Sequence, residues 1–240
     1  MHAHTSADRF EALRAAQQIA YDRAPAIRAV YEFAKMTPQD LKGPDDLARL
    51  AVTSKDMLLA KQRESPPFGG FLAVDETAIR RLFVSPGPIY EPQLFDDGNG
   101  HGFSHTFRHA GIGPGDRVLN TWSYHLVPAG LLLDEGIAAT GATLIPSGPG
   151  GAEHQAKIIV ELGITCICAS TGFFVTLIET LERMGYDLPS QWKVRSAMLG
   201  GELGDWMGKR RELEEKYAIK TFSAYGTGDF GLIAYEEQGR

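Results

Sequence analysis

Hydrophobic and polar positions along the chain follow two different periods. In residues 9–24, and again in residues 27–34, apolar side chains recur every three or four positions. This spacing is typical of amphipathic helices, so two helices are expected near the start of the chain. Two hydroxyl residues, Thr37 and Ser54, stand where they would cap further helix starts. The amino-terminal region is therefore predicted to be helical.

After Gly115 the pattern changes to five short β-like runs separated by helical stretches. The runs comprise residues 117–122, 142–146, 164–169, 194–199 and 219–224. The helical stretches comprise residues 126–139, 153–162, 173–184 and 205–217, with Gly163 and Gly185 as two helix stops. This alternation predicts an α/β fold with a mainly parallel sheet covered by helices. We therefore divide the chain into a helical region, residues 1–84, and an α/β region, residues 85–240.

Four loops follow the carboxyl ends of predicted strands. In open parallel sheets, ligands bind where the strands end. The four loops follow Trp122, Ala169, Leu199 and Ala224, and they hold the least ordinary residues of the α/β region. A binding site is expected there.

Composition and charge narrow the class of protein. The 240 residues are 43% hydrophobic and carry a formal net charge of −6, without a basic stripe of Lys and Arg. A nucleic-acid partner is therefore not expected. The amino terminus lacks a secretory signal pattern, and the apolar runs are too short to cross a bilayer, so a cytoplasmic protein without membrane contact is predicted. Cys166 and Cys168 are interpreted as buried structural residues.

The segment from Tyr225 to Gly231 contains the spacing Gly-x-Gly-x-x-Gly after a predicted strand. A dinucleotide-binding loop must open a helix, whereas residues 232–235 have the pattern of another strand. The glycines still allow the backbone to approach an anion, and the oxygens of Thr227 and Asp229 suit Mg²⁺. A tight turn between two strands is the alternative, and the residues alone do not decide between these interpretations.

The same segment is part of a longer resemblance. Residues 224–236, Ala-Tyr-Gly-Thr-Gly-Asp-Phe-Gly-Leu-Ile-Ala-Tyr-Glu, resemble the Tyr-Gly-x-(Thr/Ser)-Glu motif of adenylate-forming enzymes. The form is that of phenylacetate-CoA ligase-like and coenzyme F390 synthetase-like proteins. Residues 110–118, 141–146 and 199–202 are similar to three further segments of that family. The resemblance runs in order from Phe10 to Glu236.

This resemblance implies ATP-dependent activation of a small carboxylic acid, aromatic in type, to an acyl-adenylate and then to an acyl-CoA. ATP and coenzyme A would be co-substrates and Mg²⁺ the metal. By the family pattern, Asp229 would hold the metal and act with Thr227 in catalysis. The residues implied in nucleotide binding are Ser85, Gly87, Gly201, Glu202, Ala224, Tyr225, Gly226 and Thr227.

Two loops are implied in binding the acid. Tyr124 and His125 follow the first strand of the predicted sheet, and Ser170 and Phe173 occupy a Gly-Thr-Pro-Ser-aromatic position of the family. An aromatic residue at a helix start is more often part of the core, and a histidine in an apolar stretch is usually structural. Both interpretations remain open at this point.

The sequence departs from the family at the phosphate-binding loop, which is usually rich in Ser, Thr and Gly and ends in Gly-Lys-Pro. The matching residues here, 85–92, include prolines that remove backbone donors, and Glu91 brings a negative charge where a lysine would meet phosphate. Gly228 also replaces the hydroxyl residue of the Tyr-Gly motif. These departures favour an alternative function, a non-catalytic relative that binds a nucleotide or an acyl ligand.

Further expectations concern partners and histidines. The sequence ends before the small carboxyl-terminal lid of the family, so it is expected to be a fragment, a natural truncation or one part of a split enzyme. The partners considered are the small acid, a second copy in a homodimer, and a separate lid-bearing chain. His101, His105 and His109, spaced four residues apart, are expected to share one face of a helix, which is interpreted as solvated rather than metal-binding.

Overall fold

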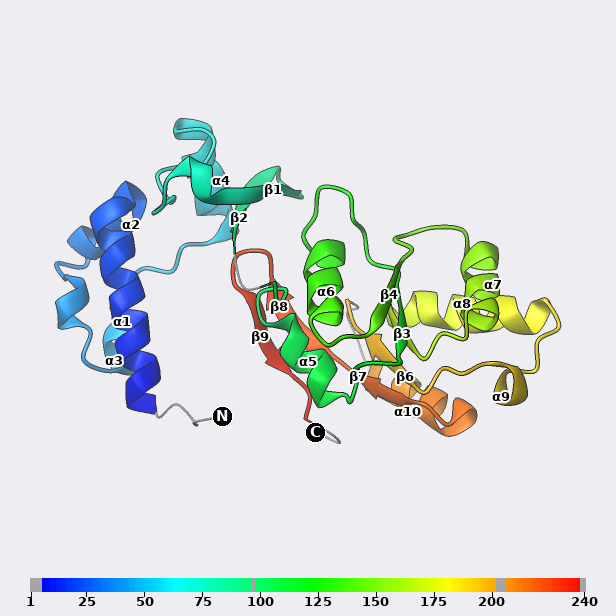
Figure 1. Cartoon of the computed structure of the whole chain (residues 1–240). Helices are drawn as coiled ribbons and strands as arrows, with labels where there is room; N and C mark the ends of the chain where they lie inside the picture. Colours follow the sequence, from blue (N-terminus) through cyan, green and yellow to red (C-terminus); the bar gives the residue numbers. More distant parts are fainter. Residues whose placement is uncertain (1–5, 96–97, 202–205, 238–240) are drawn as a thin grey trace. The chain divides into compact units, whose positions relative to one another are not determined.

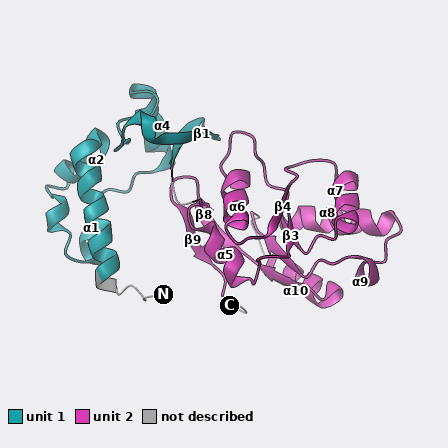
Figure 2. Ribbon diagram, in the orientation of Figure 1, with its two compact units in different colours: residues 1–94 teal, residues 95–240 magenta. Residues whose placement is uncertain are grey.

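The chain forms two compact units, Met1–Leu94 and Phe95–Arg240 (Figure 2). The computed structural model describes residues 6–95, 98–201 and 206–237. The division between the units falls after Leu94, whereas the sequence pattern placed it after Val84. The segment between these two positions belongs to a β-hairpin of the first unit.

The first unit begins with helices, as the sequence predicts. Its α-helices and 3₁₀ helices are α1 (Ser6–Arg23), α2 (Pro25–Phe33), η1 (Pro38–Asp40), α3 (Pro44–Leu47), α4 (Lys55–Glu64) and η2 (Glu76–Ala78). Tyr31 is buried between α1 and the following turns, and its ring meets that of Tyr21 edge-on at 5.6 Å between centroids. The Ser54 side chain accepts a hydrogen bond from the Met57 amide, which confirms the capped start of α4.

The hairpin that ends the first unit was not predicted. Strands β1 (Ile79–Ser85) and β2 (Ile89–Leu94) pair in antiparallel fashion. Every second residue of β2 is buried, but two of these residues are polar, Glu91 and Gln93. Hydrophobic alternation, the usual signal of a strand, is therefore missing from the sequence here.

The second unit contains a five-stranded sheet in which every pairing is parallel, in the order β4-β3-β5-β6-β7 (Figure 1). Its strands are β3 (Arg117–Asn120), β4 (Thr143–Pro146), β5 (Cys166–Ala169), β6 (Ser196–Leu199) and β7 (Lys220–Phe222). Its helices are α5 (Phe103–His109), α6 (Ala129–Ala138), α7 (Ala152–Glu161), α8 (Thr171–Arg183), α9 (Leu188–Gln191) and α10 (Trp206–Tyr217). The predicted α/β fold is confirmed.

Side chains of the sheet alternate between two hydrophobic clusters. On one face, Leu119, Ile167 and Ala197 pack with residues of α7, α8 and α10. On the other face, Val118, Cys166, Cys168 and Met198 pack with α5 and α6. The two cysteines are fully buried, as expected of structural residues. Both sheet faces are therefore covered by helices, as crossover connections between parallel strands require.

Two glycines end helices as predicted. Gly163 lies just beyond α7 with a φ of 58°, and Gly185 lies just beyond α8 with a φ of 87°. The left-handed conformation costs a glycine little because it has no Cβ atom. Each helix can therefore turn back toward the next strand within a few residues.

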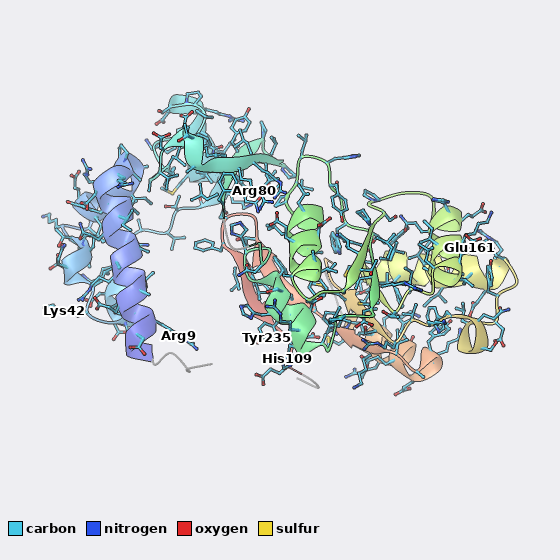
Figure 3. All side chains as sticks on the ribbon, in the orientation of Figure 1. Arg9, Lys42, Arg80, His109, Glu161 and Tyr235 are labelled. Atoms are coloured by element: carbon cyan, nitrogen blue, oxygen red, sulfur yellow. The ribbon has the colours of Figure 1, made fainter. Side chains whose placement is uncertain are left out.

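A second hairpin follows the sheet. Strands β8 (Ala224–Thr227) and β9 (Gly231–Tyr235) pair in antiparallel fashion, which confirms the strand expected after the glycine-rich segment. The Leu232 amide donates to the His101 carbonyl at 2.9 Å, and the Tyr235 ring lies 5.3 Å from that of His109 (Figure 3). His101 precedes α5 with a φ of 49°. The expectation that three histidines share one helical face is therefore wrong, because α5 begins after His101.

The amino-terminal edge of the sheet is held by Asp116. Its carboxylate accepts hydrogen bonds from Arg195 at 2.6 and 2.7 Å, from the Gly113 amide at 3.0 Å and from Thr165 at 2.8 Å. Burial opposes ionisation of this carboxyl group, but the hydrogen bonds and the Arg195 charge prevail and lower its pKa. No helix in the described part of the chain is long and apolar enough to span a membrane.

The lowered pKa of Asp116 gives its ion pair a predictable pH dependence. A carboxyl pKa that is lower in the folded state contributes stability above the unfolded value, about 3.9, and loses it as the pH falls through the folded value. We expect Asp116→Asn to reduce the free energy of unfolding at neutral pH, and this deficit to shrink as the pH approaches about 2. Urea titrations of both proteins across this range measure it. If the difference in the free energy of unfolding stays constant with pH, the lowered pKa of Asp116 is contradicted.

Candidate functional site

A cavity of about 290 Å³ lies at the carboxyl ends of the strands in the second unit. Its apolar wall comes from α5, α6, β6 and the loop after β3. Its other side comes from the residues that follow β6 and from β8. The lining residues that matter most are Phe103, Trp122, Leu132, Leu133, Gly201 and Tyr225. This is the edge at which the sequence places a binding site, because parallel strands end there together.

Gly201 packs closely against Trp122 in the lining of the cavity. Gly201 has a φ of 84°, and a Cβ atom at this position would lie 2.6 Å from the Trp122 indole. Both the backbone conformation and the space therefore require glycine. Neither Trp122 nor Phe103 was predicted as a site residue. The position of Trp122 at the end of a predicted strand was a usable signal, whereas nothing in the local sequence distinguishes Phe103 from ordinary core.

The β8–β9 hairpin supplies the glycine-rich side. The Tyr225 side chain is 64% exposed, so one face of its ring is open to a ligand. A Cβ atom at Gly226 would lie 2.7 Å from the Phe103 ring, which shows how tightly β8 packs on α5. The Thr227 hydroxyl accepts a hydrogen bond from the Phe230 amide at 3.2 Å. Asp229 lies exposed in the turn between the strands.

Five of the residues predicted to bind the nucleotide meet at this cavity, namely Gly201, Ala224, Tyr225, Gly226 and Thr227. Glu202 lies outside the described residues. Ser85 and Gly87 belong to the first unit, where Ser85 ends β1 and Gly87 lies in the turn of the hairpin. The Ser85 hydroxyl donates to the carboxylate of Glu91. Glu91 is buried and paired with Lys55 at 3.4 Å.

None of the four residues predicted to bind the acid is among those lining the cavity. Tyr124 is half-buried, and its hydroxyl accepts a hydrogen bond from Asn120 Nδ2 at 2.9 Å. Burial and the nearby Asp134 carboxylate raise the pKa of Tyr124 well above its usual range. His125 is exposed in the same loop.

Ser170 and Phe173 have structural roles at the start of α8. The Ser170 hydroxyl accepts a hydrogen bond from the Phe173 amide at 3.1 Å, which caps the helix. The Phe173 side chain packs on the hydrophobic cluster between the sheet and α8. These contacts agree with the structural interpretation of this pair, in which Ser170 caps the helix and Phe173 belongs to the core.

A larger cavity, of about 440 Å³, lies near the amino ends of β6 and β7 and contains none of the predicted site residues. It is lined by charged residues that bond one another. Arg210 donates to the Glu236 carboxylate at 2.9 and 2.7 Å, and Glu214 accepts from Thr221. In the described residues, no three His, Cys, Asp or Glu side chains are grouped as a metal site requires.

Comparison with known proteins identifies relatives. No protein-family model matches the chain. It is 30% identical over 226 residues to the phenylacetate-coenzyme A ligase of Pseudomonas putida, covering 91% of this chain and 50% of that enzyme. The corresponding ligase of Escherichia coli K12 is 28% identical over 217 residues, covering 88% and 48%. The chain therefore spans about half the length of the curated relatives it matches.

A solved structure has the same fold. The chain matches 2-hydroxyisobutyryl-CoA ligase, crystallised in an open conformation with 2-HIB-AMP and CoA, with a TM-score of 0.85 and 22% identity. The match covers 93% of this chain and 51% of that one. It supports the α/β architecture described above.

The capping contact of Ser170 leads to a stability prediction. Ser170→Ala should lower the free energy of unfolding by about 1 kcal/mol, because the Phe173 amide loses its partner. Ser170→Asp should stay near the wild-type value, since a carboxylate also caps. Urea denaturation of the three proteins provides the measurement. If alanine and serine are equally stable, Ser170 is not a cap, and its role in a ligand pocket becomes the better explanation.

Proposed function

We propose that this chain, a homologue of the phenylacetate-coenzyme A ligases over about half of their length, binds an adenine nucleotide within an enzyme that activates a small carboxylic acid. ATP and the acid would give an acyl-adenylate and pyrophosphate, and the thiol of coenzyme A would then take the acyl group and release AMP. The observation that carries this proposal is the convergence of five predicted nucleotide-binding residues on one cavity.

The lining of the cavity suits the parts of such ligands. The exposed ring of Tyr225 offers a stacking surface for a purine, and stacking on an aromatic side chain tolerates any base. The glycines at 200, 201, 226 and 228 let the backbone approach a ligand closely. Trp122, Leu132 and Leu133 form an apolar wall on the opposite side. That wall suits an aromatic acyl group better than a charged one.

Attack of a carboxylate on the α-phosphate builds negative charge, so the reaction needs charge stabilisation. Mg²⁺, when bound, would supply it by neutralising phosphate oxygens. Magnesium keeps several waters and takes one or two carboxylates in addition to phosphates, so a single exposed carboxylate such as Asp229 fits this role. Thr227 already accepts a hydrogen bond from Phe230, and its own proton can be donated to a phosphate oxygen.

The first unit favours a second candidate function, a relative that binds the ligand without turnover. The segment that matches the family's phosphate loop is a closed hairpin, in which the Ser85 hydroxyl bonds Glu91 and Glu91 pairs with Lys55. These groups bond one another, and the Glu91 carboxylate among them is buried. Release of pyrophosphate that depends on an added aromatic acid distinguishes the enzyme from the non-catalytic binder, which would bind AMP without releasing pyrophosphate.

Stacking on Tyr225 predicts a specific loss of nucleotide affinity. Tyr225→Ala should weaken AMP binding by roughly 1 to 3 kcal/mol in calorimetric titration, which is the usual worth of a base stacked on an aromatic ring. Tyr235→Ala is the matched control, because Tyr235 lies in the same hairpin against His109 and does not line the cavity. An unchanged affinity in Tyr225→Ala, or an equal loss in both variants, would remove the stacking role.

A role for Asp229 in holding magnesium predicts that its charge matters for ATP more than for AMP. Asp229→Asn preserves size and removes the charge, so binding of Mg-ATP should weaken clearly more than binding of AMP. Asp187→Asn, at the exposed start of α9, serves as the control. Parallel calorimetric titrations with the two nucleotides make the comparison. Equal losses for both nucleotides would indicate that Asp229 only closes the turn.

A further inference from the structure

The last residue of β3, Asn120, is a fully buried amide whose hydrogen-bonding groups are all engaged. Its Nδ2 donates to the Tyr124 hydroxyl at 2.9 Å and to the Gly130 carbonyl at 3.0 Å. Its Oδ1 accepts from the Trp122 amide at 3.2 Å. All three partners belong to the segment that leads from β3 into α6. One side chain therefore bonds to the beginning, the middle and the end of this segment.

The segment tied by Asn120 forms part of the cavity wall. Trp122, Pro128 and Ala129 all line the cavity. Trp122 is itself a partner of the amide, and Pro128 and Ala129 lie between the partners Tyr124 and Gly130. The Gly130 amide also donates to the Ser123 carbonyl at 2.9 Å. A Cβ atom at Gly130 would collide with that carbonyl, so the two ends of the loop approach each other as closely as backbone permits.

Tyr124 connects this loop to both Asn120 and α6 through its hydroxyl group. Its hydroxyl receives the Asn120 hydrogen bond and also bonds the carboxylate of Asp134, which belongs to α6. The hydroxyl is thus engaged on both sides by the protein. Asn120, Tyr124 and Asp134 form a short chain of side chains that links the end of β3 to the helix behind the loop.

We propose that Asn120 is a positioning residue that holds the Trp122 loop so that the indole packs against Gly201 in the lining of the cavity. The Trp122 indole lies close against Gly201, and the hydrogen bond from the Trp122 amide to Asn120 holds its backbone two residues after the end of β3. The effect on ligand binding rests on the proposed function, whereas the position of the loop does not.

The position of Trp122 can be read directly by ¹⁹F NMR. The chain has three tryptophans, so protein labelled with 5-fluorotryptophan gives three resonances, and Trp122→Phe identifies the one from Trp122. In Asn120→Ala the Trp122 resonance should shift and broaden, while those of Trp192 and Trp206 stay in place. Asp116→Asn, which removes the charge of a buried, ion-paired carboxylate just before the amino end of the same strand, should leave the Trp122 resonance unchanged.

If Asn120→Ala does not fold, Tyr124→Phe is the second variant that tests the proposal. It removes only the hydroxyl, and we expect the Trp122 resonance to move without a change in the other two. The proposal is overturned if the Trp122 resonance keeps its wild-type position and width in the variant that folds. It is also overturned if all three resonances change alike, because that pattern reports a general loss of structure.

AMP titration of the same variants separates this proposal from the proposed function. Loss of a buried hydrogen-bonded amide commonly costs enough to weaken a dependent interaction by about tenfold. Asn120→Ala should therefore bind AMP about tenfold more weakly than the wild type, and Asp116→Asn should bind it normally. If the wild-type chain does not bind AMP, the proposed function fails, and the NMR result still decides the role of Asn120.

Discussion

Asn120 ends a strand that is buried on both faces, and its side-chain amide must find hydrogen-bond partners inside the protein. An unpaired amide there would cost several kcal/mol, by the range for polar groups transferred from water without a partner. The partners come from the segment after β3, so satisfying the amide dictates the path of that segment. This segment contributes Trp122, Pro128 and Ala129 to the wall of the cavity.

Glycines at points of close contact let the other side of the cavity form. Gly201 meets the Trp122 indole and Gly226 meets the Phe103 ring, and neither position has room for a side chain. The result is a cavity with an apolar wall from the sheet and helices and a glycine-rich backbone side from the residues after β6 and from β8. Such a division suits a ligand with a planar apolar part and a charged part.

The parts of the fold with clear periodicity were predictable from the sequence. The parallel strands are short apolar runs, and α7 and α8 between them end at glycines, so both appear in the pattern of residues. The β1–β2 hairpin was not predictable, because Glu91 and Gln93 take the buried positions of β2 and remove the alternation. His101 was misplaced because a residue with positive φ separates it from the helix.

The candidate site was predictable only in part. The glycine-rich segment is recognisable by composition and by resemblance, and its residues do meet at one cavity. Ser170 and Phe173 illustrate the opposite case, since a hydroxyl three residues before an aromatic suits both a ligand loop and a capped core helix. Asn120 was not recognised because an asparagine at a strand end gives no local sign of three separate partners. The roles of the individual residues in binding and catalysis stay predictions.

Hydrogen exchange with and without AMP tests most directly whether the cavity of the second unit is the nucleotide site. The account predicts slower exchange on adding AMP in residues 121–130, 199–201 and 223–228, with no change in the strands and helices far from the cavity. Slower exchange around Arg210 and Glu236, at the larger cavity, would contradict it. So would an absence of any change at saturating AMP.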